Sequence, residues 1–227
     1  MEKLLYLIFD DPNSNVKTLR ESLIREVVPV LRTCGAVEIS VFASDEEVAA
    51  GKPTRRCDPP IVAALSFLLT DLEKRGPGEA AIRSRVSALA GYLVGESRPI
   101  THERSEGRRL PGMVQMTCLT KRPEIDSDEF RRLWHEDHLS VAIETQSTFG
   151  YVRNEIIRPL TEGAPRHWAG IVEETFPIEA LTDPRVFFNA QSDAELSANV
   201  GRMVESCQRF LDLGNLEVTF MSEYYFD

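Results

Sequence analysis

The chain has 227 residues, of which 42% are apolar and 27% are charged. This is the composition of a folded protein with a sizeable core, and it excludes fibrous, collagen-like and wholly disordered chains. With 26 basic and 36 acidic residues the formal net charge is −10, which argues against binding to nucleic acid or to an anionic membrane. Four scattered cysteines and the lack of a bilayer-spanning apolar stretch predict a cytoplasmic protein with reduced thiols.

The first half of the chain contains six segments whose periodicity predicts secondary structure. In chain order they are a strand at 4–9, a helix at 16–31, strands at 37–41 and 61–70, a helix at 79–89 and a strand at 90–95. The helices are predicted from apolar residues that recur every three or four positions, and the strands from short apolar or alternating runs. A polar, basic stretch at 98–111 then predicts a linker.

The same order of elements restarts after this linker. The predicted elements are a strand at 114–120, a helix opened by the capping sequence Asp126–Glu129, strands at 151–157 and 168–175, a helix at 193–211 and a strand at 216–226. An offset of 111 residues places Val27 on His138. The sequence therefore predicts an α+β fold of two β-α-β-β-α-β, ferredoxin-like units at residues 1–105 and 112–227. The alternative is two generic α+β domains that match by accident.

The pattern with the most chemical content lies on one face of the helix predicted after Asp126. Phe130, Trp134 and His138 are spaced four residues apart, so they lie on the side of the helix that faces the sheet. Burial beside a large aromatic ring lowers the pKa of an imidazole and keeps it neutral, which suits a general base near neutral pH. The alternative is a core histidine whose nitrogens are hydrogen-bonded to a backbone carbonyl or a carboxylate.

Further candidates lie on the two strands that follow this helix. Tyr151 and Arg153 point to the same side of their strand, so they either orient an anionic or phenolic ligand or form a structural pair. His167 and Trp168 are adjacent and therefore point to opposite faces, so at most one of them is expected in a pocket. The apolar insertion at 177–189 is expected to cover either the core or a pocket.

No metal or cofactor site is predicted. His135 and His138 are three residues apart, but His135 falls off the inward face and no further cysteine or histidine cluster accompanies them. The sequence also has no glycine-rich phosphate loop, no His-Glu-x-x-His motif and no Gly-x-Ser-x-Gly motif. These observations favour cofactor-free acid/base chemistry. Cys118 lies in the middle of a predicted strand and is expected to be a buried apolar residue rather than a nucleophile.

The second half resembles the EthD family in the sequence F-x-x-x-W-x-x-x-H and in the Gly-Tyr strand that follows it. The matching residues are Phe130, Trp134, His138, Val141, Gly150 and Tyr151. The resemblance covers residues 112–227 well and residues 1–105 only weakly. It implies membership of the dimeric α+β-barrel superfamily, in which two ferredoxin-like units pair sheet against sheet. In this chain the two halves would form that barrel between them, as an internal pseudo-dimer.

The resemblance also implies a range of activities and one site residue. Relatives include dehydratases, dehalogenases, lactone isomerases, cyclases and cofactor-free monooxygenases of small, often aromatic or polyketide-like molecules. The family's histidine carries over to His138 alone, because Val27 occupies the equivalent place in the first half. The first half is therefore expected to be a scaffold and the second half to carry the site.

The leading hypothesis is a cofactor-independent lyase or isomerase, such as a dehydratase, that acts on a small, partly apolar metabolite. In it His138 moves a proton, Phe130 and Trp134 form a dry wall, and Tyr151 holds a substrate oxygen. Other hypotheses are a non-catalytic carrier of a hydrophobic metabolite, a cofactor-free monooxygenase, and a structural homo-oligomer with solid packing around His138. The expected partner is a small-molecule substrate, and the chain is expected to be an internal pseudo-dimer or a homodimer.

Overall fold

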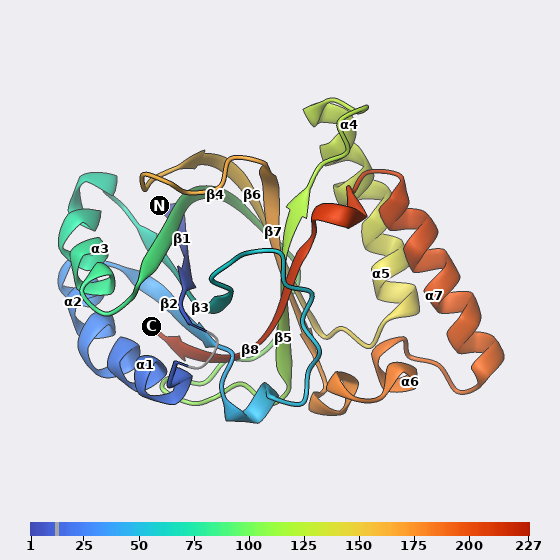
Figure 1. Ribbon diagram of the computed structural model, residues 1–227, viewed down its shortest axis with the longest axis horizontal. Coiled ribbons are helices and arrows are strands. Elements are labelled where there is room, and N and C mark those ends of the chain that lie inside the picture. The colour runs from blue at the N-terminus through green and yellow to red at the C-terminus, as the bar shows by residue number, and fades with distance from the viewer. Residues whose placement is uncertain (12–13) are drawn as a thin grey trace.

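The computed structural model describes residues 1–11 and 14–227, and this part of the chain folds into one closed barrel with helices on its outside (Figure 1). Neighbouring strands are antiparallel and follow the order β1-β3-β2-β8-β5-β7-β6-β4 around the barrel. The strands are β1 (Glu2–Phe9), β2 (Val37–Ala43), β3 (Ile61–Leu69), β4 (Ala88–Ile100), β5 (Met113–Thr120), β6 (Gly150–Pro159), β7 (Trp168–Phe176) and β8 (Glu217–Phe226). The predicted mixture of helices and strands is confirmed.

The two halves of the chain each contribute four neighbouring strands, and they do so in the same order. The first half supplies the run β4-β1-β3-β2 and the second half supplies the run β8-β5-β7-β6. The halves join along β2 and β8, where Ile39 pairs with Phe226, and along β4 and β6, where Ile100 pairs with Tyr151. Apolar side chains from both halves fill the interior, so the barrel has one shared core.

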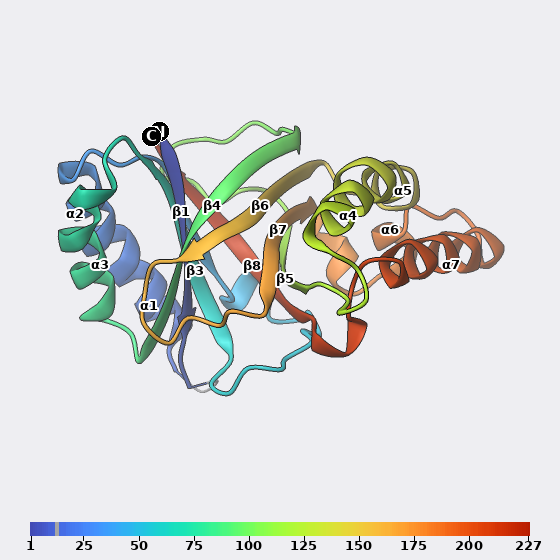
Figure 2. The ribbon, with the colours of Figure 1, turned by 90° about the horizontal axis from the view of Figure 1, so that it is seen from above.

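Helices cover the outside of the barrel in two groups, one over each half (Figure 1, Figure 2). The first group comprises α1 (Val16–Ser22), η1 (Leu23–Val27), α2 (Val28–Thr33), η3 (Leu72–Lys74) and α3 (Arg75–Arg83). The short helix η2 (Glu46–Val48) lies against β8, and its Val48 packs with Met113 and Phe176. The second group comprises α4 (Ser127–Arg132), η4 (Leu133–His138), α5 (Leu139–Thr145), η5 (Ile178–Leu181), α6 (Pro184–Phe187), α7 (Asp193–Gln208) and η6 (Leu213–Asn215). In the described residues, none of these helices combines the length and the apolar character that a bilayer crossing requires.

The long helix of each half differs from the regular helix that the apolar periodicity predicts. In the second half the predicted start is confirmed, because the Asp126 side chain accepts a hydrogen bond from the backbone N–H of Glu129 at 2.8 Å. The helix then passes through a π-helical turn, η4, that ends at His138. The first half has the same kind of turn, η1, and it ends at Val27. The wider turn therefore occurs at matching places in both halves.

Strand β4 extends beyond the predicted strand and takes up the first residues of the predicted linker. It runs to Ile100, whereas the local pattern ends the strand near residue 95. The extra residues pair with β6 of the other half, as Ser97 does with Arg153. Pairing with a strand some 55 positions away leaves no periodic signal in a short sequence window. The connection between the halves is therefore shorter than the predicted 98–111 segment.

Candidate functional site

A cavity of about 320 Å³ lies between the second-half strands and the helices that cover them. Its floor is a row of side chains on neighbouring strands. Gln115 of β5 pairs with Phe220 of β8 and with Glu174 of β7, and Glu174 pairs with Tyr151 of β6. Directly paired residues of adjacent strands point to the same face of a sheet, so these four side chains stand side by side. Thr117 lines the cavity one row further along.

The roof of the cavity comes from η4 and from the end of α7. Trp134 and His138 of η4 line it together with Cys207 of α7 and with Phe210, which follows α7 and contacts the His138 ring. The Trp134 indole lies directly over Gly170, where a Cβ atom would be only 2.6 Å from the indole ring. Its Nε1–H donates a hydrogen bond to the Tyr151 hydroxyl at 3.4 Å. The lack of a side chain at Gly170 thus allows the indole to approach the sheet and to contact the floor.

His138 is a buried, neutral imidazole at neutral pH. Its side chain is 7% exposed and its ring lies 5.1 Å from the ring of Phe210. Nδ1 lies 2.9 Å from the Ser206 hydroxyl, which is hydrogen-bonding distance. No partner for Nε2 is found among the described residues. Burial lowers the pKa of His138 to about 4, so the ring is neutral at pH 7. In the tautomer in which Nδ1–H donates to the Ser206 hydroxyl, Nε2 has the free lone pair and can accept a proton.

Glu174 is a second ionisable group in the same cavity, and it was not predicted from the sequence. Its side chain is buried, and Oε2 accepts a hydrogen bond from Gln115 Nε2 at 3.2 Å. Burial raises the pKa of the Glu174 carboxyl to about 7, and the Gln115 hydrogen bond offsets this only in part. The neighbouring Glu173 points into the barrel. There its Oε1 accepts hydrogen bonds from Lys3 Nζ at 3.3 Å and from Asn154 Nδ2 at 2.8 Å.

A sequence signal for Glu174 did exist. Two consecutive glutamates interrupt a strand that is mostly apolar and is buried on both faces. Because successive side chains alternate, one of the two must face the barrel interior and the other must face the helices. A buried carboxylate on each side of the sheet needs a partner or a raised pKa, so the pair Glu173–Glu174 marks both places.

The remaining polar groups of the cavity hold their protons at neutral pH. Burial raises the pKa of the Tyr151 hydroxyl well above its usual value, and burial raises the pKa of the Cys207 thiol to about 12. The hydroxyl of Thr117 is buried without a hydrogen-bond partner among the residues that the structure describes. The cavity therefore offers neutral hydrogen-bonding groups around two groups, His138 and Glu174, whose pKa values are shifted in opposite directions.

The structure brings three of the predicted site residues together. Trp134, His138 and Tyr151 all line the cavity. Phe130 does not reach it. Its ring lies behind the indole, with 5.5 Å between the ring centroids of Phe130 and Trp134, and it packs against Phe210 at 5.7 Å. Phe130 thus supports the wall from the core side.

The other predicted residues lie elsewhere. Arg153 shares the helix-facing side of β6 with Tyr151, but its guanidinium donates to the Ser97 hydroxyl at 2.9 Å and to the His135 carbonyl at 3.0 Å. Its hydrogen bonds therefore tie β6 to β4 and to η4. Trp168 points into the barrel interior, and His167 is exposed at the start of β7. Neither of these two residues enters the cavity, because the strand turns the indole inward and leaves the imidazole outside the fold.

Metal-ligating side chains do not gather near the cavity. Within residues 1–11 and 14–227 there is no group of three or more histidine, cysteine, aspartate or glutamate side chains placed to hold a metal ion. His135 is half-buried beside the cavity wall, and burial lowers the pKa of its imidazole. Cys118 is buried in the barrel interior, where burial raises the pKa of its thiol, so it is no thiolate nucleophile.

The cavity also receives residues from the first half, which the sequence did not indicate. Lys52 and Thr54 lie on its rim. They belong to the segment between β2 and β3, drawn in cyan in Figure 1, which crosses to the second-half strands. Two backbone hydrogen bonds join Thr54 to Val218 of β8, at 3.0 and 2.9 Å. The first half therefore contributes part of the cavity lining.

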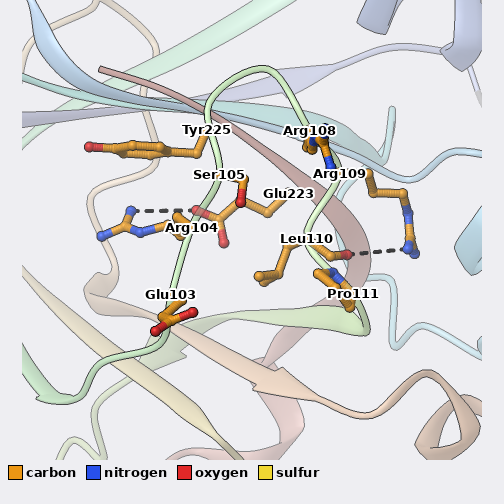
Figure 3. A pocket seen from close by; sticks show the side chains of 9 residues that line it. All are labelled: Glu103, Arg104, Ser105, Arg108, Arg109, Leu110, Pro111, Glu223 and Tyr225. Atoms are coloured by element: carbon orange, nitrogen blue, oxygen red, sulfur yellow. Dashed lines mark hydrogen bonds and ion pairs between the residues drawn. The ribbon is translucent and has the colours of Figure 1, made fainter.

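A second hollow, of about 240 Å³, lies where the segment 103–111 crosses β8 (Figure 3). Three of its charged side chains, Arg104, Arg109 and Glu223, have partners within the protein. Arg104 lies 3.5 Å from the buried carboxylate of Glu223. Arg109 donates to the Ser222 hydroxyl at 2.9 Å and to two backbone carbonyls. These groups hold the connection between the halves in place, and the hollow is not the candidate site.

Comparisons with known proteins bear on the fold of the whole chain and on one segment of its second half. Two solved structures share the fold over nearly the whole chain. One is an anthrone oxidase-like protein, with 13% identity, a TM-score of 0.58, and coverage of 99% of this chain and 92% of that chain. The other is a dye-decolorizing peroxidase from Bacteroides thetaiotaomicron VPI-5482, with 6% identity, a TM-score of 0.52, and coverage of 97% and 92%. At these identities the likeness shows the fold alone.

Sequence comparison identifies the second half more closely. No curated protein matches this chain. Residues 122–214 match the EthD domain family, and this stretch includes η4, β6, β7 and α7. It holds both shifted groups of the cavity, His138 and Glu174. The match to the EthD domain family is thus confined to residues 122–214 of this chain.

Proposed function

We propose that this protein is a cofactor-independent acid/base enzyme of lyase or isomerase type, such as a dehydratase. Its substrate is a small, partly apolar molecule that binds in the 320 Å³ cavity. The observation that carries this proposal is the pair of oppositely shifted groups in one cavity. With a pKa of about 4 for His138 and about 7 for Glu174, the usual order of a histidine and a glutamate is reversed. Groups whose pKa values are pushed apart in this way are typical acid and base partners.

The reversed order assigns a role to each group at neutral pH. The neutral imidazole of His138 is the base and accepts a proton from a carbon next to a carbonyl group. The electron pair of that C–H bond forms a carbon–carbon double bond, and the bond from the neighbouring carbon to its hydroxyl oxygen breaks. Glu174, in its protonated form, gives its proton to this oxygen, which leaves as water. Transfer of one proton from the imidazolium to the carboxylate through solvent restores both groups.

The other predicted residues have supporting roles in this proposal. Trp134 and Phe130 keep the imidazole dry, since the indole covers the floor and the phenyl ring packs behind it. The Tyr151 hydroxyl accepts the indole N–H, which leaves its own proton free to bond a substrate oxygen. Arg153, His167 and Trp168 are left without a part in binding, because they lie outside the cavity.

The proposal also covers the arrangement of the two halves and the location of the protein in the cell. We propose that the halves 1–105 and 112–227 are two ferredoxin-like units and that the barrel is an internal pseudo-dimer. The identical strand order of the two halves and the matching π-helical turns support this view. The proposal also places the protein in the cytoplasm, where it meets a soluble metabolite, and gives it no resident metal or cofactor.

The proposal is tested by proton exchange, since this requires no knowledge of the natural substrate. A panel of β-hydroxy carbonyl compounds with aromatic or alkyl substituents is incubated with the protein in D₂O, and NMR follows deuterium uptake and loss of water. Compounds that react with the wild-type protein are then given to His138→Gln. We expect its rate to fall by roughly 10²–10⁴-fold, as when a general base is removed. His135→Gln is the matched control and is expected to retain its rate.

Each other outcome selects a different function. A folded His138→Gln protein that keeps the full rate contradicts the role of His138. Binding of panel compounds without any exchange supports the carrier hypothesis. Consumption of dissolved oxygen in place of exchange supports the cofactor-free monooxygenase hypothesis.

A further inference from the structure

An apolar hollow, distinct from the one in Figure 3, adjoins the proposed active-site cavity. It measures about 400 Å³ and lies against the segment that contains η5 and α6. Three residues, Lys52, Gln115 and Phe220, line both hollows. Phe220 and Gln115 are paired on neighbouring strands, so the shared boundary is one end of the floor row. The two hollows therefore meet along a short border, and of these three shared residues Lys52 carries the positive charge.

We propose that the two hollows form one elongated binding site for an organic anion. The acidic group of this ligand binds the Lys52 ammonium at the border, and its apolar part lies in the 400 Å³ hollow. Its remaining end extends toward His138 and Glu174. Only the placement of this last, reacting end rests on the proposed function; the anion and the apolar part are recognised by other residues.

The backbone on either side of Lys52 packs closely against residues that line the two hollows. A Cβ atom on Gly51 would lie 2.6 Å from a ring carbon of Phe220 and 3.0 Å from a methyl group of Leu181. Only glycine lets the chain approach these two side chains so closely. On the other side of Lys52, the backbone bonds of Thr54 to β8 fix the segment. Lys52 is thus held at the border from both directions.

Lys52 carries an exposed positive charge at the border. Among the described residues, no carboxylate lies within ion-pair distance of its ammonium, in contrast to Lys3, which contacts Glu96 and Glu173. The protein as a whole has a net charge of −10, and the Lys52 ammonium supplies a local positive charge next to apolar walls, where it attracts an anion. A carboxylate or sulfonate fits this position.

The 400 Å³ hollow has rigid aromatic walls. Phe187 stacks on Phe176 with 4.4 Å between the ring centroids, and Phe188 meets Phe187 edge-on at 4.9 Å. The backbone of the same segment is fixed from outside, since Asn199 donates to the Phe188 carbonyl at 2.8 Å and Ser147 donates to the Phe187 carbonyl at 3.0 Å. Fixed aromatic walls favour rings or a hydrocarbon chain and require little ordering when a ligand binds.

The test uses two fluorescent probes with the same rings. 8-Anilinonaphthalene-1-sulfonate carries an anionic group, and N-phenyl-1-naphthylamine lacks it. Fluorescence titration gives the dissociation constant of each probe for the full-length protein. We expect Lys52→Met to weaken binding of the anionic probe about fivefold and to leave binding of the neutral probe unchanged within about twofold. Leu181→Asp, which puts a charge on the apolar wall, is expected to weaken both probes.

Arg108→Met is the matched control, because Arg108 lines the separate hollow of Figure 3 and its guanidinium has no partner among the described residues. It is expected to leave both affinities unchanged. The proposal is overturned if Lys52→Met changes neither affinity or weakens both equally, or if the anionic probe responds to Arg108→Met instead. Probe binding involves no proton transfer, so these results are independent of the His138→Gln exchange rate, and either proposal can fail alone.

Discussion

The two halves of the barrel place different side chains on the same frame. Strand register matches the outward residues of β1 and β3 with those of β5 and β7. In the first half, Leu4 pairs with Phe67 and Tyr6 pairs with Leu65. At the matching places of the second half, Gln115 pairs with Glu174 and Thr117 pairs with Val172. The first-half side chains are large, mostly apolar and almost fully buried. The first half thus fills the space between sheet and helices, whereas smaller or polar residues leave it open in the second.

The helices repeat this contrast at one position. Val27 and His138 both end a π-helical turn, and both are buried. Val27 packs in an apolar cluster, whereas His138 contacts the Ser206 hydroxyl and the cavity. Wider helical turns often occur at functional sites, but here the same turn serves packing alone in the first half. The turn is therefore a property of the frame, and function depends on which side chains it carries.

The largest expected effect concerns Glu174, whose apolar counterpart is Phe67. A carboxyl with a pKa of about 7 when folded and 4.5 when unfolded binds protons more tightly in the folded state. Its stabilising contribution is complete below pH 4.5 and is lost as the pH rises to 7. This amounts to about 3 kcal/mol. Glu174→Gln does not titrate, so we expect its free energy of unfolding relative to wild type to rise by up to about this amount between pH 5 and pH 8.

Urea unfolding of both proteins at the two pH values measures this difference. The control is Glu162→Gln, because Glu162 is exposed and its variant is expected to follow the wild type at both pH values. If Glu174→Gln also follows the wild type, then Glu174 titrates normally and the cavity is open to water.

A smaller effect is expected from exchanging the residues that end the two π-helical turns. Val27→His places an imidazole among apolar side chains with no hydroxyl beside it, and we expect the free energy of unfolding at pH 7 to fall by about 1–3 kcal/mol. The reverse change is made as His138→Val with Ser206→Ala, so that both hydrogen-bonding groups are removed together. It is expected to change the free energy of unfolding by less than about 1 kcal/mol.

Urea denaturation at pH 7 checks both variants. A Val27→His protein as stable as the wild type would show that the first half also accommodates a polar group. The contrast between a filled half and an open half would then be wrong.

The sequence was sufficient to predict Trp134 and His138 in the roof of the site and Tyr151 in its floor, but neither Glu174 nor the rim. The spacing of Phe130, Trp134 and His138 is a local property of one helix, and their predicted burial is confirmed. Glu174 becomes a cavity residue only through its register with Gln115 and Tyr151, which joins strands far apart in the sequence.

Two further placements depended on distant contacts. Lys52 reaches the rim because Thr54 binds β8 of the other half, and no local pattern encodes this contact. Trp168 lies next to an irregularity in the pairing of β5 with β7, and such a shift changes which face a side chain takes. Alternation alone therefore could not decide between His167 and Trp168.

The most direct test of an acid/base pair in the open half is a pH titration of its two groups in the same protein. NMR of the protein labelled with ¹⁵N-histidine and ¹³C-glutamate follows His138 and Glu174, with His138→Gln and Glu174→Gln to assign the signals. We expect the imidazole to titrate with a pKa of about 4 and the carboxyl with a pKa of about 7. Titration of His138 near 6.5 and of Glu174 near 4.5 would mean that both are solvated as in unfolded chains. That result would contradict the proposed pair.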